Sequence, residues 1–126
     1  VIDVTNPLVF RDEQPPELTV GHSISGGEIV QQSLPDSHVV KALNTVNHKH
    51  MAQPEYKEGL PTMFICGNNQ SAVASTADLL DELGWKDIVD LGGIEKSRLL
   101  EPLCLLWVEY GVARNTWDHA FSVLQR

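Results

Sequence analysis

The stretch from residue 62 to residue 91 constrains the fold most, because it predicts a strand, a helix and a second strand in succession. Residues 62–66 form a continuous apolar run bounded by a proline and a glycine, which is typical of a strand buried on both faces. Residues 70–83 carry apolar side chains at three- and four-residue spacings and stop before Gly84, which predicts an amphipathic helix. Residues 85–91 predict the next strand, so this part of the chain has the order of an α/β protein.

The preceding residues continue the alternation of strands and helices. Residues 1–5 and 38–43 are rich in β-branched side chains and predict two more strands, and residues 9–23 predict a long surface loop. Ser25 and Glu28 have the spacing of a capping box, so a helix is expected from Ser25 to about residue 33. The order predicts an α/β fold with a largely parallel sheet and flanking helices.

The C-terminal third predicts mainly helix. A long helix is expected from about residue 94, with a kink or a late start at Pro102, followed by a further helix over 115–124. Arg98 and Glu101 lie three residues apart on one face of the long helix, which is the spacing of an ion pair. The same helix carries a wide apolar stripe formed by Leu99, Leu100, Leu103, Leu106, Trp107 and Tyr110.

The composition limits the classes of partner. The 126 residues fit a single domain, and the net charge of −8 disfavours nucleic acid and anionic membrane surfaces as partners. No apolar stretch approaches the ~20 residues of a membrane span.

Cys66 and Cys104 lie far apart inside apolar runs, so both are expected to be buried, reduced thiols. Because the chain shows no signal peptide, a cytoplasmic location is expected.

Three predicted strands end in small or polar residues, at 5–7, 42–45 and 92–93. Ligands of open α/β sheets bind beyond the carboxyl ends of the strands, and parallel strands would bring these three ends to one edge. The alternative is that each strand runs into an ordinary solvated loop. His48 and His50 alternate, but no third ligand stands at metal-binding spacing, so no metal is expected. No nucleophile motif is present, so no catalytic side chain is assigned.

Five motifs occur in one order along the chain: Val-Ile-Asp-Val-Thr-Asn-Pro-Leu (1–8), Ser-Gly-Gly-Glu-Ile-Val (25–30), Val-Val-Lys-Ala-Leu-Asn-Thr-Val (39–46), Phe-Ile-Cys-Gly-Asn-Asn (64–69) and Asp-Leu-Gly-Gly-Ile-Glu-Lys-Ser-Arg-Leu-Leu-Glu-Pro-Leu (90–103). Together they resemble the second part of the NADP oxidoreductases that depend on coenzyme F420. They are also similar to the cytosolic oxidoreductase domain of STEAP metalloreductases.

The resemblance implies a Rossmann-like NAD(P)-binding domain that passes hydride between NADP(H) and a flavin or the deazaflavin coenzyme F420. In that family the glycine-rich phosphate loop lies in an N-terminal part of two or three βαβ units, each of ~30 residues. No G-x-G-x-x-G motif occurs here, and Val1 already reads as the middle of a strand. Residues 1–126 are therefore expected to be the C-terminal portion of such a domain, lacking its N-terminal βαβ part.

The resemblance also implies site residues. The nicotinamide-ribose region would be lined by Thr5, Asn6, Pro7 and Leu8. The gap for hydride transfer would be faced by Ala42, Asn44, Thr45 and Val46. The acceptor side would be formed by Asn47, His48, Gly92 and Gly93.

No catalytic acid or nucleophile is required in this interpretation, because the two cofactors carry the hydride chemistry and the protein aligns their rings. The expected partners are these small-molecule cofactors and a second copy of the chain in a homodimer. The alternative is a non-catalytic nucleotide-binding or oligomerisation domain, with the apolar stripe of the long helix packed against another subunit.

Overall fold

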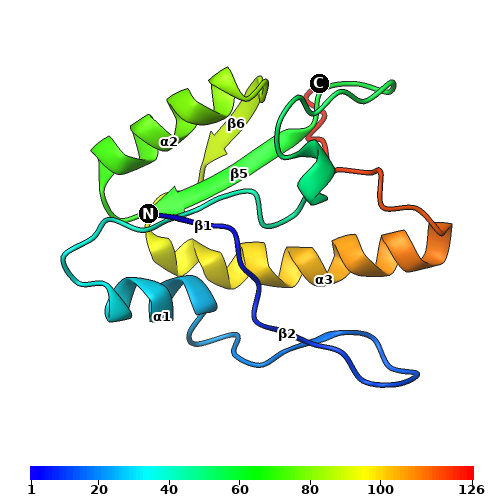
Figure 1. Ribbon diagram of the computed structural model, residues 1–126, viewed down its shortest axis with the longest axis horizontal. Helices are drawn as coiled ribbons and strands as arrows, with labels where there is room; N and C mark the ends of the chain where they lie inside the picture. Colours follow the sequence, from blue (N-terminus) through cyan, green and yellow to red (C-terminus); the bar gives the residue numbers. More distant parts are fainter.

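A mixed four-stranded sheet forms the centre of the computed structural model, which describes residues 1–126 (Figure 1). Its strands follow the order β1 (Ile2–Asp3), β4 (Val40–Lys41), β5 (Thr62–Gly67) and β6 (Asp87–Asp90). The pairs β1–β4 and β5–β6 are parallel, whereas β4 and β5 are antiparallel. The prediction of an α/β fold with a largely parallel sheet is therefore confirmed, with one reversal at its centre.

Helices cover both faces of the sheet: α1 (Gly26–Ser33), α2 (Gln70–Glu82) and α3 (Ser97–Arg114). The helix α2 lies on one side of β5, and α3 and α1 lie on the other (Figure 1). Side chains of β5 alternate between these layers, since Met63 and Ile65 join the core beneath α2 while Cys66 packs with Ile94 and Leu100 on the α3 side. This burial on both faces explains why the sequence of β5 is continuously apolar.

The reversal between β4 and β5 changes which strand ends lie together. The connection from β4 to β5 contains only the short 3₁₀ helix η1 (His48–His50), and a parallel return normally needs a helical crossover. Gly67, at the end of β5, pairs with Val40 at the start of β4 and donates its N–H to the carbonyl of Gly92 at 2.9 Å. Gly92 and Gly93 therefore lie at the opposite edge from the carboxyl ends of β1 and β4. The expectation that all three strand ends meet at one edge is wrong.

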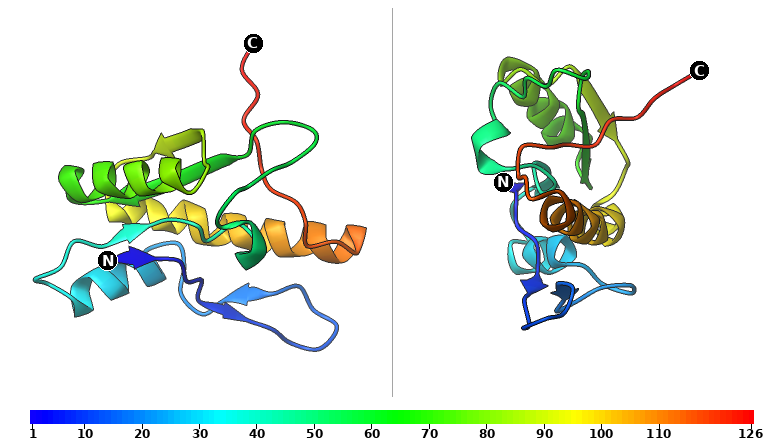
Figure 2. Two further views of the ribbon diagram at one scale, coloured as in Figure 1. Left: turned by 45° about the horizontal axis from the view of Figure 1, so that its top comes forward. Right: turned by 90° about the vertical axis from the view of Figure 1, so that its right-hand side faces the viewer.

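The C-terminal segment is extended, so the expected helix over 115–124 is wrong. α3 ends at Asn115, which adopts a left-handed conformation with φ of 50°. The following residues then run past the start of β5 (Figure 2), where the Thr62 N–H donates to the Phe121 carbonyl and the Val123 N–H donates to the Thr62 hydroxyl, both at 2.9 Å. Because these backbone groups bond to β5, they are not available for a helical ladder.

Smaller differences concern the loops and α3. The expected loop over 9–23 contains part of a hairpin formed by β2 (Leu8–Val9) and β3 (Glu17–Leu18). A short 3₁₀ helix, η2 (Ile94–Lys96), precedes α3, which continues through Pro102. Only part of the apolar stripe of α3 faces the core. Leu100 and Trp107 are buried, whereas Leu99 and Leu106 are 63% and 58% exposed. No helix has the combination of length and apolar character that crossing a membrane requires.

The capping box at the start of α1 is confirmed and is extended by a residue of α3. The Ser25 hydroxyl accepts the N–H of Glu28, whose carboxylate accepts the N–H of Ser25. Arg98 binds the same carboxylate, with Nη2 2.5 Å from Oε1, so it pairs with Glu28 and not with Glu101. The bond from Arg98, supported by those from Ser25, lowers the pKa of Glu28 to about 2.

We expect Glu28 to contribute to stability in a pH-dependent way. Its pKa is lowered on folding, so its contribution is present above its ordinary pKa of 4.5 and is lost as the pH falls from that value towards 2. Glu28→Gln should therefore lose less of its free energy of unfolding than wild type between pH 6 and pH 3. Urea unfolding at the two pH values measures this, with Glu82→Gln, exposed at the end of α2, as a control that keeps the wild-type pH dependence. Equal pH dependence in wild type and Glu28→Gln would contradict the prediction.

Candidate functional site

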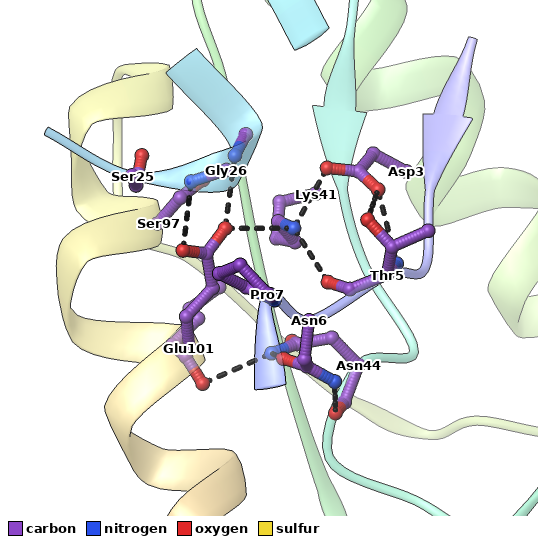
Figure 3. Close-up of polar contacts among 12 residues, drawn as sticks. Asp3, Thr5, Asn6, Pro7, Ser25, Gly26, Lys41, Asn44, Ser97 and Glu101 are labelled. Carbon is purple, nitrogen blue, oxygen red and sulfur yellow. Dashed lines mark hydrogen bonds and ion pairs between the residues drawn. The ribbon is translucent and has the colours of Figure 1, made fainter. Parts of the chain in front are cut away.

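Two asparagines tie together the carboxyl ends of β1 and β4 (Figure 3). The Asn6 side-chain amide donates to the Asn44 carbonyl at 2.8 Å, and the Asn44 side-chain amide donates to Asn6 Oδ1 at 2.9 Å. Asn44 also donates to the carbonyl of Leu100 in α3 at 2.9 Å, and it is only 4% exposed. These bonds hold the two strand ends and α3 in one arrangement.

Beneath this pair lies a buried lysine that contacts three acceptors (Figure 3). Lys41 is completely buried, and its ammonium lies 2.7 Å from Asp3 Oδ2 and 2.9 Å from Glu101 Oε1. Its third bond, at 2.7 Å, is donated to the carbonyl of Thr5. The ammonium thus forms two ion pairs and one hydrogen bond, and the hydrogen bond fixes the backbone that leads into Asn6.

The second carboxylate of this cluster is stabilised by the start of α1. Glu101 accepts the backbone N–H groups of Gly26 and Gly27, each at 2.9 Å. A helix N-terminus carries a partial positive charge, so it favours a carboxylate at this position. For Asp3, burial raises the pKa, but the bonds from Lys41 and Thr5 outweigh it and leave the pKa below its ordinary value. The cluster of Asp3, Lys41 and Glu101 thus joins β1, β4, α1 and α3.

The residues expected on the nicotinamide side all lie at this edge. Thr5 is exposed, whereas Asn6, Pro7 and Leu8 are partly buried, and Leu8 begins β2. After β4 the expected residues are all buried: Ala42, Asn44, Thr45 and Val46. Ala42 and Val46 belong to the hydrophobic core. The structure therefore brings Thr5, Asn6 and Asn44 together, whereas Ala42 and Val46 support the edge from beneath.

The residues expected on the acceptor side are divided between two places. Asn47 directly follows Val46 in the chain, and its side-chain amide donates to the carbonyl of Trp117 in the C-terminal segment at 3.2 Å. His48 is exposed at the start of η1. Gly92 and Gly93 lie at the other edge of the sheet, away from the asparagine pair.

Sequence reasoning did not single out the charged cluster beneath the site. Lys41 stands among valines and alanine in a predicted buried strand, and a buried lysine is found almost only with an opposite charge. That signal predicts a carboxylate partner, but not which one, because Asp3 and Glu101 are far from Lys41 in sequence. Two cavities of about 510 and 520 Å³ occur elsewhere, beside the loop over 53–61, and neither is lined by the asparagine pair.

Comparison with known proteins identifies relatives of this chain, although no family model matches it. It is 28% identical over 109 residues to the F420-dependent NADP reductase of Methanocaldococcus jannaschii. It also superimposes on the crystal structure of a candidate F420-dependent NADP reductase from an Arthrobacter species, with a TM-score of 0.92 and 36% identity over 98% of the chain. The chain is related to the F420-dependent NADP reductases.

The chain spans about half the length of these reductases: 48% of the Methanocaldococcus protein and 56% of the Arthrobacter protein. A hypothetical protein from Sinorhizobium meliloti is also similar, with a TM-score of 0.59 and 32% identity over 76% of this chain and 46% of its own. The TM-score of 0.92 means that nearly all of the present fold follows the course of the Arthrobacter structure.

Proposed function

We propose that the intact protein is an NADP-dependent oxidoreductase that transfers hydride between NADPH and a flavin or a deazaflavin such as coenzyme F420. The observation that supports this most is the asparagine pair that fixes the carboxyl ends of β1 and β4, where open α/β sheets bind their ligands. The names of the two reductases support NADP and F420 as the cofactors.

The residues at this edge are of a kind that suits a nicotinamide ring. Asn44 Oδ1 is buried and accepts no hydrogen bond within the chain. Small and amide side chains at this edge allow a flat ring to approach, and Thr5 and Asn6, which are less buried than Asn44, offer polar groups to its carboxamide. The nicotinamide supplies the hydride chemistry when bound, so the role of the protein is to align the rings and exclude water. We place Thr5, Asn6, Pro7 and Asn44 beside the nicotinamide, and Asn47 and His48 on the acceptor side.

Substitution of Asn44 tests the proposal in the intact protein. Asn44→Leu removes the bonds to Asn6 and Leu100 and the free acceptor oxygen, so kcat/KM for hydride transfer from NADPH to F420 or a flavin should fall about tenfold or more. The loss of NADPH absorbance measures the rate, and thermal unfolding shows whether the variant is folded at the assay temperature.

A matched control is Gln32→Leu on α1, because it makes the same change from an amide to leucine at an exposed position outside the proposed site. Its turnover should equal that of wild type. Unchanged turnover in Asn44→Leu would remove Asn44 from the site.

A second candidate function rests on the exposed Leu99 and Leu106 of α3, which fit the interpretation of a nucleotide-binding or oligomerisation domain that packs as a homodimer. A protein of that kind would bind NADPH without oxidising it in the presence of either acceptor. The hydride-transfer assay with wild type therefore separates the two functions.

A further inference from the structure

The residue before Asn44 has an unfavourable backbone conformation. Leu43 has a φ of 59°, in the left-handed region, and its side chain is buried in the core. Bulky residues rarely adopt this conformation, and where they do the surrounding structure must hold them in it. The effect at this position is to turn the chain out of β4 immediately before the asparagine pair.

The group that holds this turn is a thioether sulfur. The N–H of Leu43 donates to Sδ of Met63 at 3.2 Å, and Met63 is only 1% exposed on the neighbouring strand β5. The β4–β5 ladder pairs Val40 with Gly67 and Lys41 with Cys66, so the ladder ends at Lys41 and Leu43 lies two residues beyond it. A buried N–H at such a point needs an acceptor, and the sulfur supplies one where no carbonyl does.

We propose that Met63 is a positioning residue for hydride transfer. Its sulfur holds Leu43 in the left-handed conformation, and this conformation directs Asn44 to Asn6 and to the carbonyl of Leu100. The inference rests on the proposed function, because it assigns to Met63 a role in orienting the residue placed beside the nicotinamide. Leucine would fill a similar volume but offers no acceptor, so the sulfur and not the bulk of the side chain is what this position requires.

The chain contains a matched control for this inference. It has two methionines, Met51 and Met63. Met51 packs against the same hydrophobic core, but the hydrogen bond that it accepts, from the Trp85 indole, goes to its backbone carbonyl. Met51→Leu therefore changes a thioether beside the same core without removing a hydrogen bond.

The first experiment compares Met63→Leu and Met51→Leu in the intact protein by NMR, without turnover. In Met63→Leu, the Leu43 amide should exchange with solvent about tenfold faster or more, and the side-chain amide signals of Asn44 should shift. In Met51→Leu both should remain as in wild type. If Met63→Leu and Met51→Leu show the same exchange and the same Asn44 signals, the proposal is overturned.

The second experiment separates positioning from stability. Met63→Leu should lower kcat for hydride transfer about tenfold, and adding Leu43→Gly should restore most of it, because glycine adopts the left-handed conformation without a sulfur to hold it. The same addition removes a buried leucine side chain, so the midpoint of thermal unfolding should fall further. Recovery of kcat with a lower midpoint supports the proposal, whereas a parallel fall of both overturns it.

The two experiments also distinguish this inference from the proposed function. If wild type transfers no hydride to any flavin or F420, the proposed function fails, and the assignment of Met63 to that reaction fails with it. The exchange of the Leu43 amide and the signals of Asn44 still decide whether Met63 holds Asn44 in place.

Discussion

Lys41→Met is expected to lower the free energy of unfolding by about 3–5 kcal/mol, which is the usual effect of removing one partner from a buried ion pair. The substitution keeps the length of the side chain but leaves Asp3 and Glu101 as two buried carboxylates without their shared cation. It also removes the donor that holds the Thr5 carbonyl. Urea unfolding at neutral pH measures the loss.

Two further variants show whether the charge is responsible. Lys86→Met breaks an exposed ion pair with Asp81 and should cost at most about 1 kcal/mol. The combined replacement of the cluster by Asp3→Asn, Lys41→Met and Glu101→Gln leaves no buried charge, so it should recover much of the stability lost in Lys41→Met. A Lys41→Met variant no less stable than Lys86→Met would show that the cluster does not stabilise the fold.

Gly27→Ala is expected to destabilise the protein by about 1–3 kcal/mol, because it overpacks the contact between α1 and α3. A Cβ at this position would collide with the Ser97 hydroxyl oxygen and would lie 2.9 Å from the Ser97 Cβ. It would also lie 3.2 Å from the Cε of Lys41, so the strain reaches the charged cluster. The N–H of Gly27 must stay in place to bind Glu101, which limits how far α1 can move away.

A double-mutant cycle with Ser97→Gly tests this steric explanation. The double variant should lose less stability than the sum of the two single variants, because the atoms that collide with the new methyl group are gone. Gly21→Ala is the control, since its Cβ would make only an ordinary contact with Leu18 at 3.4 Å. Additive losses in the cycle would mean that the contact with Ser97 is not the cause.

The local elements of this protein could be predicted because their signals lie within a few residues. The apolar run of β5, the periodic pattern of α2 and the capping box of Ser25 and Glu28 each arise from short-range physics: burial on two faces, a 3.6-residue repeat and bonds to the first helical N–H groups. The sequence also showed that β1 and β4 end in polar residues, which is why Asn6 and Asn44 could be expected at one site.

The tertiary structure decided which distant residues meet. Sequence patterns did not predict that β5 runs antiparallel to β4, and this reversal separates Gly92 from Asn44. The helix expected over 115–124 is replaced by an extended segment, because bonds with Thr62 outweigh a local preference. Lys41 reaches Glu101, and Met63 reaches the Leu43 N–H, only once the sheet and α3 are assembled.

The sequence by itself thus determined the type of most elements and the polar ends of two strands, because backbone preferences and side-chain periodicity act over a few residues. Contacts between residues far apart in the chain decide three other features: the direction of the central strand pair, the partners of the buried charges and the turn at Leu43. The energies of those contacts are set by burial, which exists only in the folded structure.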